Sequence, residues 1–355
     1  MRFISLENCE EGMTIGKNIY GKNAILLLRY GTKVKPAHLQ TLKRLGYPGI
    51  YIEDELSLGI DIEPTVNEVT RNNASKAVQD LFTSKFNGTI THDAVIKEIE
   101  GILGDIVAQI TQGSDAAANL AALKIFDSYT YQHCVDVGVL SIILGREIGM
   151  TKSSLIELGK AAFFHDLGKM FILKSILNKP ARLTPEEFDE IKTHPVLGHD
   201  TLLGDLRQSQ RIAEGALYHH ERYDGSGYPN GIAGDKIPLF AKIIAVADVY
   251  DAITTERAYK RALIANEAYE FVMANSGTHF CPEVVKVFVR KIPPFTVGTG
   301  VILSTNALAV VVQNKPNFMT RPLVKLIKQN IFDEDIYIDL TEDADARSIT
   351  IVGTM

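Results

Sequence analysis

One stretch of the sequence is the best guide to the fold class: Phe163-Phe164-His165-Asp166-Leu167-Gly168-Lys169. Apolar residues precede it at helical spacing, so an apolar helix presents an adjacent His and Asp just before a glycine. An imidazole and a carboxylate at adjacent positions can reach one metal ion, and the Asp has a second oxygen to share with another. A lone His-Asp pair also arises by chance and at ordinary helix C-termini. The pair therefore indicates a metal site only together with further ligands.

The helical pattern extends over the whole middle of the chain. From about residue 121 to 292, apolar residues recur at helical spacing between loops marked by Gly and Pro. Thr184 is predicted to cap a helix that has Pro185 at its first position, and this helix is expected to run to His194. The segment 121–292 is therefore expected to be an α-helical body.

The segments on either side have other patterns. Residues 1–63 mix short strand-like runs with a helical stretch and predict a small α/β adaptor. Residues 64–120 predict a helical connector. After Pro293-Pro294, β-branched runs split by turn residues predict a small β-rich extension over 293–355.

Composition limits the class of protein. With 355 residues, 46% of them hydrophobic and 23% charged, the chain is long enough for two or three globular domains. A net charge of −6 gives no reason to expect DNA as a partner. The three cysteines are scattered, which favours a reducing compartment. The first residues do not resemble a signal peptide and no apolar run is long enough to span a bilayer, so we expect a cytoplasmic protein.

A second motif carries two consecutive histidines: Tyr218-His219-His220-Glu221-Arg222-Tyr223-Asp224-Gly225-Ser226-Gly227-Tyr228-Pro229. Successive side chains of a helix point about 100° apart. Two such imidazoles suit a dinuclear metal centre better than an apolar core, where a buried pair without partners would be costly.

A third motif places carboxylates in an apolar helix. The run 244–252 (IAVAD-VYDA) carries Asp248 and Asp251 on one face. Carboxylates are almost never fully buried unless they are paired or metal-bound, so Asp248 is expected to face a cation. A salt bridge to Arg257 or Lys260 is the alternative, and it suits Asp251 better than Asp248.

Two further histidines complete the candidate set, His133 within a long apolar helix and His194 before Pro195. Taken singly, each is more often a core or surface histidine than a ligand. Five His and two Asp within one helical segment favour a metal centre. Carboxylate and imidazole ligands without thiolates suit iron or manganese better than a structural zinc.

The order of these motifs resembles the HD superfamily of metal phosphohydrolases, and the segment from His219 to Pro229 resembles its HD-GYP branch, the cyclic di-GMP phosphodiesterases. The resemblance covers about residues 121–292 and implies an HD-type helical catalytic domain in a mainly α protein. It implies that one of two divalent ions is held by His133, His165, Asp166 and Asp248. It implies that Asp166 also bridges to a second ion, held by His194, His219 and His220.

The resemblance also implies residues that contact the substrate. Lys169 is expected beside the phosphates and, with Asp166, among the catalytic residues. Arg257 and Lys260 are expected near the phosphates, with Asp251 beside the site; the ordinary alternative for the cations is solvated helix ends. Gly227 and Tyr228 are expected to shape the pocket and the path of the substrate.

Two departures from the family pattern matter. Tyr129 stands where some members have a Glu that holds a third metal, so we expect two ions rather than three. Cys281 stands where an Asp is common, and it is expected to be structural. His279 is not expected to be a ligand.

The expected reaction is hydrolysis of cyclic di-GMP to pGpG, with possible further cleavage to GMP, through a bridging water that loses its proton and attacks phosphorus in line. Two alternatives stay open: a phosphohydrolase acting on another cyclic dinucleotide, and a non-catalytic receptor or adaptor. The terminal segments are candidates for contact with signalling proteins or with a second copy of the chain, and the β-rich extension is also a candidate for contact with the N-terminal unit.

Overall fold

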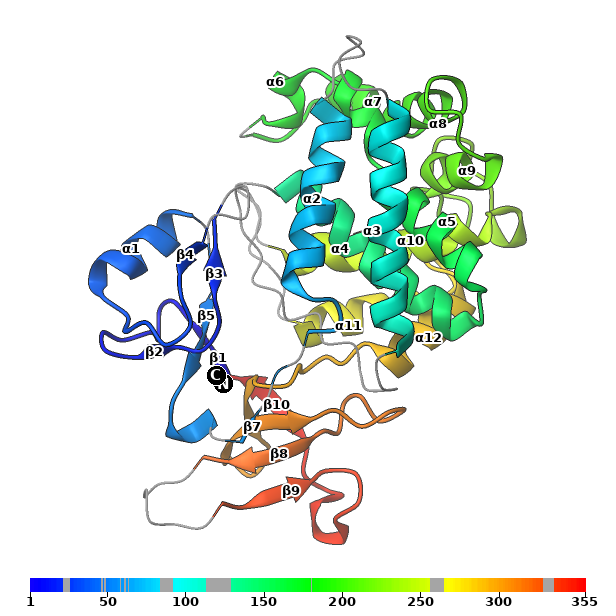
Figure 1. Cartoon of the computed structure of the whole chain (residues 1–355). Helices are drawn as coiled ribbons and strands as arrows, with labels where there is room; N and C mark the ends of the chain where they lie inside the picture. Colours follow the sequence, from blue (N-terminus) through cyan, green and yellow to red (C-terminus); the bar gives the residue numbers. More distant parts are fainter. Residues whose placement is uncertain are drawn as a thin grey trace. The chain divides into compact units, whose positions relative to one another are not determined.

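The fold is described from a computed structural model (Figure 1). The described residues are 1–21, 26–45, 47, 49–57, 59–60, 62, 64–83, 92–112, 129–179, 181–255, 265–327 and 335–355. They form two compact units. The terminal unit includes described residues of Met1–Thr65 and Val289–Met355, and the helical unit includes those of Val66–Gly113 and Thr130–Phe288.

The helical unit confirms the expectation of a mainly α protein. The helices from the start of this unit run in chain order as follows: α2 (Glu68–Thr83), α3 (His92–Gln112), α4 (Tyr129–Ile148), α5 (Lys152–Phe163), η4 (Leu167–Phe171), α6 (Lys174–Leu177), α7 (Pro185–Ile191), α8 (His194–Gly204), α9 (Gln210–Tyr218), η5 (Gly234–Lys236), α10 (Leu239–Thr254), α11 (Ala265–Ala274) and α12 (Pro282–Lys291).

Two central helices bury almost their whole circumference. On α10, ten residues are buried, eight of them apolar. On α4, buried residues such as Val135, Leu140 and Leu144 point in different directions around the helix. A helix that is apolar on all sides belongs in a core, and each buried Val, Leu or Ile contributes about 1.5–3 kcal/mol. These two helices therefore give the site a rigid base.

The helix start at Thr184 is confirmed, whereas the predicted end of that helix is wrong. Thr184 Oγ1 accepts a hydrogen bond from the backbone N–H of Glu187, whose side chain accepts from the N–H of Thr184. The helix α7 ends at Ile191, and His194 is the first residue of the next helix, α8. Proline lacks an N–H, which the first turn of a helix does not need, so Pro195 fits in the first turn of α8.

The described residues of the terminal unit form three small sheets. Its N-terminal part has a β1-β5-β2 sheet and a β3-β4 pair, and its C-terminal part has an antiparallel sheet in the order β10-β6-β7-β8-β9. The elements are β1 (Arg2–Ser5), β2 (Thr14–Ile15), β3 (Ile19–Tyr20), β4 (Leu26–Leu28), α1 (Pro36–Arg44), β5 (Gly49–Glu53), η2 (Glu55–Ser57), β6 (Gly300–Leu303), β7 (Leu308–Gln313), β8 (Leu323–Leu326), β9 (Tyr337–Asp339), η6 (Ala344–Ala346) and β10 (Ile351–Thr354).

The two ends of the chain share a hydrophobic cluster within the terminal unit. Tyr51, Ile60 and Ile62 pack with Val310 of β7, and all four are buried. The N–H of Phe3 also donates to the carbonyl of Gly298 at 3.0 Å. The α/β adaptor and the β-rich extension therefore contact each other. The boundaries placed at residues 63, 120 and 292 stay a prediction.

Among the described residues, no helix combines the length and the apolar character that crossing a bilayer requires.

Candidate metal centre

All seven candidate ligands meet in the helical unit. They come from five places in the chain: α4, the turn between α5 and η4, the start of α8, the segment after α9, and α10. The ring centroids of His165 and His219 are 5.0 Å apart, and those of His194 and His219 are 5.4 Å apart. In three groups, the possible ligand atoms lie within 4.8 Å of one another: Asp166, His194, His219 and His220; His133, His165 and Asp166; and His165, His219 and Asp248.

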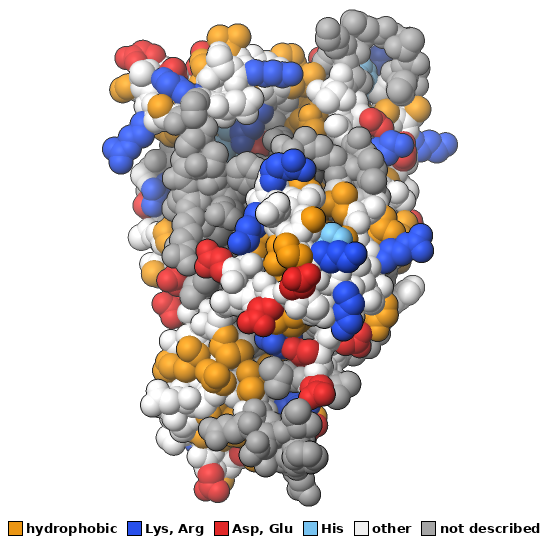
Figure 2. Space-filling view, turned by 90° about the vertical axis from the view of Figure 1, so that its left-hand side faces the viewer, with side chains coloured by type: hydrophobic (Ala, Val, Ile, Leu, Met, Phe, Trp, Pro, Cys, Tyr) orange, Lys and Arg blue, Asp and Glu red, His pale blue; other side chains and the backbone are white. Residues whose placement is uncertain are grey.

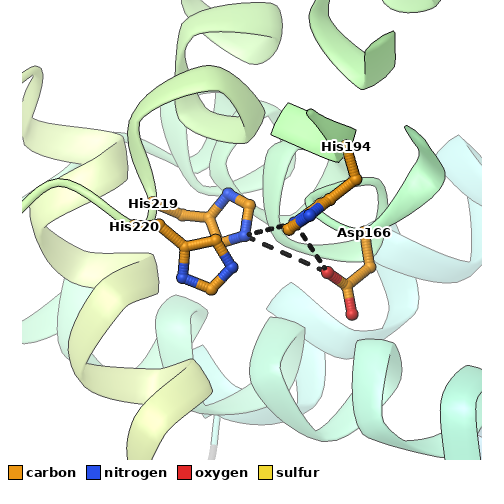
Figure 3. Close-up of side chains that lie close together, drawn as sticks. All are labelled: Asp166, His194, His219 and His220. Carbon is orange, nitrogen blue, oxygen red and sulfur yellow. Dashed lines mark hydrogen bonds and ion pairs between the residues drawn. The ribbon is translucent and has the colours of Figure 1, made fainter. Parts of the chain in front are cut away.

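Asp166 stands between two of these groups. Its Oδ1 lies 3.5 Å from Nε2 of His194 and 4.0 Å from Nε2 of His219, and its Oδ2 lies 3.5 Å from Nε2 of His165. In Figure 3, ring nitrogens of His194 and His219 and a carboxylate oxygen of Asp166 point toward one another, with His220 beside His219. The two oxygens of Asp166 therefore face different sets of imidazoles, as a bridging ligand requires.

Asp248 joins the group from α10. Its Oδ1 lies 3.0 Å from Nε2 of His133 and 3.8 Å from Nε2 of His165. The other side of the His133 ring is fixed as well, because Nδ1 lies 2.7 Å from Oδ2 of Asp251. Asp251 thus contacts a candidate ligand directly, one helical turn after Asp248.

Backbone carbonyls orient three of the imidazoles. Nδ1 of His165, His194 and His219 donates to the carbonyl three residues earlier, at 2.7, 2.6 and 2.7 Å respectively. A carbonyl can only accept, so Nδ1 carries the proton and Nε2 of the neutral ring has the free lone pair. These carbonyls belong to the last turns of helices or follow them, where helices leave carbonyls unpaired. The local structure therefore presents Nε2 to the cluster.

The electrostatics favour a cation in the cluster. Burial alone would raise the pKa of Asp166, but the charges of Lys169 and the neighbouring histidines hold it well below its usual range. Burial likewise opposes ionisation of Asp248, yet the hydrogen bond from His133 and the nearby imidazoles hold its pKa well below normal. Both carboxylates are therefore anionic at neutral pH, which is the form that binds metals.

The pKa values of four of the candidate histidines fall into two groups. Burial lowers the pKa of His194 to about 4 and that of His220 to about 3, and it holds the pKa of His219 well below normal. For His133, burial also acts to lower the pKa, but the hydrogen bonds to Asp248 and Asp251 outweigh it and raise the pKa to about 9. The rings of His194, His219 and His220 are therefore neutral at pH 7, which is the form that binds a metal.

Two buried polar atoms of the site lack a hydrogen-bond partner among the described residues, and their chemistry shows whether the site suits a metal ion. Nε2 of His165 and Oδ1 of Asp166 are buried and have no hydrogen-bond partner among the described residues. Such an atom costs about 1–3 kcal/mol when it stays unsatisfied. One is an imidazole nitrogen and the other a carboxylate oxygen, both of which a divalent cation accepts as ligands. The residues present therefore fit a metal centre.

Lys169 borders the cluster where it opens to solvent. Its Nζ lies 2.6 Å from Oδ2 of Asp166, and its side chain is 31% exposed. Burial would lower the pKa of Lys169, but the charge of Asp166 outweighs this and raises it. A permanent positive charge therefore lies beside the ligands and within reach of solvent.

The remaining sequence-predicted residues divide between described and undescribed parts of the chain. Arg257 and Lys260 lie outside the described residues, as does the side chain of Tyr129. Cys281 Sγ donates to Oε2 of Glu283 at 2.9 Å, a contact at the start of α12 that suits a structural role. The ring of His279 is stacked on Phe280, with centroids 4.2 Å apart. Neither Cys281 nor His279 belongs to the ligand groups found among the described residues.

Sequence reasoning missed two features that support the ligands. It did not single out Glu221, whose side chain is 1% exposed and follows His220 directly. A carboxylate next to two candidate ligands is a sequence signal for a supporting role, but only the fold shows that it is buried. It also gave no packing role to Gly168, where η4 crosses α8.

We expect Gly168→Ala to damage the centre. A Cβ at residue 168 would lie 2.0 Å from the carbonyl oxygen of His194 and 2.6 Å from the backbone N of Gly198. Because both are backbone atoms, η4 and α8 must separate, at a cost of about 1–3 kcal/mol in the free energy of unfolding. Urea denaturation measures this change, and metal analysis should show fewer bound ions.

The matched control is Gly204→Ala at the end of α8, where an added Cβ meets nothing within 4 Å. It should change the free energy of unfolding by less than about 0.5 kcal/mol. Equal effects of the two substitutions would contradict the close contact at Gly168.

Comparison with known proteins agrees with this geometry. A family model described as HD domain matches residues 116–284. The cyclic di-GMP phosphodiesterase PA4108 of Pseudomonas aeruginosa is 37% identical over 253 residues, which are 71% of this chain and 60% of that protein. A cyclic di-GMP phosphodiesterase of Thermotoga maritima is 41% identical over 165 residues, which are 46% of this chain and 45% of that protein. The chain thus spans less than two thirds of either relative.

A solved structure shows the same fold. The HDG"Y"P protein Bd1817 from Bdellovibrio bacteriovorus matches with a TM-score of 0.52 at 18% identity, over 80% of this chain and 97% of that chain. The segment 116–284 is thus similar to the HD domain family. The resemblance of the sequence to HD-type cyclic di-GMP phosphodiesterases is confirmed by the family model and by these two relatives.

Proposed function

We propose that the chain is a metal-dependent phosphodiesterase that hydrolyses cyclic di-GMP to pGpG. The observation that carries the proposal is the meeting of seven imidazole and carboxylate side chains around Asp166, with the cation of Lys169 beside them. The relatives named as cyclic di-GMP phosphodiesterases support this substrate.

We assign two divalent ions, iron or manganese, to the centre. His133, His165, Asp166 and Asp248 would hold one ion, and Asp166 would share the second with His194, His219 and His220. When bound, two such ions supply an activated water and neutralise the charge of the phosphate that it attacks. The mixture of nitrogen and oxygen ligands without thiolate supports iron or manganese.

The chain's own residues have separate tasks in this reaction. The backbone carbonyls fix the tautomers of His165, His194 and His219, so that no proton has to leave Nε2 when a ligand bond forms. Lys169 can place its charged Nζ against a phosphate oxygen and stabilise the charge that develops during hydrolysis. Arg257, Lys260, Gly227 and Tyr228 stay predicted substrate contacts, and Asp251 is better placed to hold His133 than to touch a substrate.

The face drawn in Figure 2 suits a small ligand better than duplex DNA. On the face drawn in Figure 2, Lys and Arg side chains are interspersed with Asp and Glu, so the described residues of this face form no continuous basic stripe. Duplex binding relies on such a stripe to neutralise many phosphates. A cyclic dinucleotide has only two phosphates, which two metal ions and Lys169 can neutralise.

The test is a metal analysis and a product assay on the purified chain, prepared without oxygen. We expect about two ions per chain and conversion of cyclic di-GMP to linear pGpG. A second cyclic dinucleotide and a cyclic mononucleotide are assayed in parallel to test the choice of substrate. Binding of cyclic di-GMP without product, with iron and with manganese supplied, would contradict the proposal and favour a receptor.

A further inference from the structure

His220 is oriented differently from the other histidines of the centre. Nδ1 of His133, His165, His194 and His219 is held by a carboxylate or carbonyl oxygen. Within the described residues, no hydrogen bond reaches the ring nitrogens of His220, although the residue is largely buried. Its ring is instead stacked on another ring.

That ring belongs to Tyr228 of the GYP segment, Gly227-Tyr228-Pro229. The centroids of His220 and Tyr228 are 4.8 Å apart and their planes are inclined by 29°. The backbone N–H of Tyr228 also donates to the carbonyl of His220 at 3.3 Å. The loop that leaves His220 therefore returns to it, and one residue contacts both its ring and its backbone.

Gly227 allows this return. A Cβ on residue 227 would lie 2.3 Å from the backbone N of Arg222 and 2.6 Å from the carbonyl oxygen of His220. The end of the loop thus packs against the backbone of its own beginning, at a distance that only glycine permits. Any side chain at this position would push Tyr228 away from His220.

A buried carboxylate closes the loop. Oε1 of Glu221 accepts a hydrogen bond from the backbone N–H of Asn230 at 2.7 Å. Glu221 is 1% exposed, and its Oε2 is buried without a hydrogen-bond partner among the described residues. The carboxylate therefore ties the residue next to His220 to the residue that follows Tyr228-Pro229.

The outer side of the loop is fixed to another segment of the helical unit. The N–H of Tyr223 donates to the carbonyl of His279 at 3.0 Å, and the N–H of Asp224 donates to the carbonyl of Thr278 at 2.8 Å. These two hydrogen bonds hold the outer side of the loop. The position of its inner end depends on the contacts with His220 and Glu221.

From these contacts we infer that Tyr228 and Glu221 are positioning residues for the metal ligand His220: the stacked ring orients the imidazole, and the carboxylate holds the stacked ring in place. The inference rests on the proposed metal centre. It gives the GYP segment a task in metal binding, in addition to any contact with substrate. It also predicts that loss of either residue weakens the binding of one metal ion and not of the other. The reason is that His220 belongs to the ligand group of Asp166, His194 and His219 and to neither of the other groups.

Metal binding to chelator-treated protein tests the inference without relying on turnover. Tyr228→Leu removes the stacked ring and should weaken one of two Mn²⁺ sites by about 10–100-fold, the usual effect of losing a residue that orients a ligand. Tyr228→Phe keeps the ring and should bind both ions as the unaltered protein does. Titration followed by metal analysis measures both affinities.

A second pair of variants tests the carboxylate. Glu221→Ala removes the acceptor for the N–H of Asn230 and should weaken the same site, whereas Glu221→Gln keeps a carbonyl oxygen in its place and should restore most of the affinity. Amide exchange of the metal-free protein should show faster exchange at Asn230 in Glu221→Ala than in Glu221→Gln.

A control separates positioning from general loss of stability. Ile99→Val in the core of α3 removes one buried methyl group and costs about 0.5–1.5 kcal/mol, so it should lower the melting temperature without changing either Mn²⁺ affinity. If Tyr228→Leu does not fold, the Glu221 pair decides alone. Equal Mn²⁺ binding in Glu221→Ala and Glu221→Gln, or in Tyr228→Leu and Tyr228→Phe, would overturn the inference.

His220→Ala distinguishes this failure from failure of the proposed function. If His220→Ala weakens one site while Tyr228→Leu does not, the metal centre stands and the positioning role is wrong. If neither variant affects Mn²⁺ binding, His220 is not a ligand and the proposed centre itself is wrong.

Discussion

Asp166→Ala is expected to abolish hydrolysis of cyclic di-GMP, with a loss of about a thousandfold or more. Asp166 belongs to two of the three ligand groups, and its two oxygens face different imidazoles. Its removal therefore weakens both proposed ions at once. Metal ions contribute several kcal/mol to such reactions, and each 1.36 kcal/mol corresponds to a factor of ten in rate. The initial rate of pGpG formation and the number of ions per chain are the two measurements.

The controls for this prediction keep the fold and change one property at a time. Asp166→Asn preserves the size of the side chain and should fold normally while losing most of its metal. Asp189→Ala removes an exposed carboxylate of α7 that pairs only at the surface with Lys192, so activity should stay within about twofold. Full turnover in Asp166→Ala would exclude Asp166 as the bridging ligand.

Arg71→Met is expected to lower the free energy of unfolding of the helical unit by about 3–5 kcal/mol, the usual cost of breaking a buried ion pair by removing one partner. Arg71 of α2 forms an ion pair with Asp136 of α4, and the side chains are only 8% and 9% exposed. Gln132 also donates to Asp136, at 3.0 Å, and its amide carries no charge. Urea denaturation followed by circular dichroism measures the change.

A double-mutant cycle sharpens this second prediction. Arg71→Met combined with Asp136→Leu removes both charges, so the double variant should recover much of the stability that Arg71→Met loses. Because α4 also carries His133, three residues before Asp136, the affinity for metal should fall in Arg71→Met alone. A loss below about 1 kcal/mol in Arg71→Met would mean that the pair behaves like a surface salt bridge.

The sequence was sufficient for the fold class and for the candidate ligands. Local rules carry this information: apolar residues at helical spacing predict α4 and α10, and the pattern of Thr184, Pro185 and Glu187 predicts the start of α7. The ligands are visible for a similar reason, because imidazoles and carboxylates stand out in or next to apolar helices. Whether all seven bind metal stays a prediction until metal is measured.

The tertiary structure alone decided how these residues are supported. Asp251 and His133 are 118 residues apart in the chain yet share a hydrogen bond, and no local pattern encodes that pairing. The same is true of the ion pair between Arg71 and Asp136, 65 residues apart.

The wrong helix end and the missed supporting residues also result from contacts between residues that are distant in the sequence. Pro195 is compatible both with a helix end and with a helix start, and the start of α8 was visible only in the structure. The close contact of Gly168 with α8 and the burial of Glu221 also depend on segments that meet only after folding. Helix periodicity and ligand chemistry are properties of neighbouring residues, so the sequence determined them. Orientation and burial depend on distant partners, so only the folded chain determined which atoms face one another.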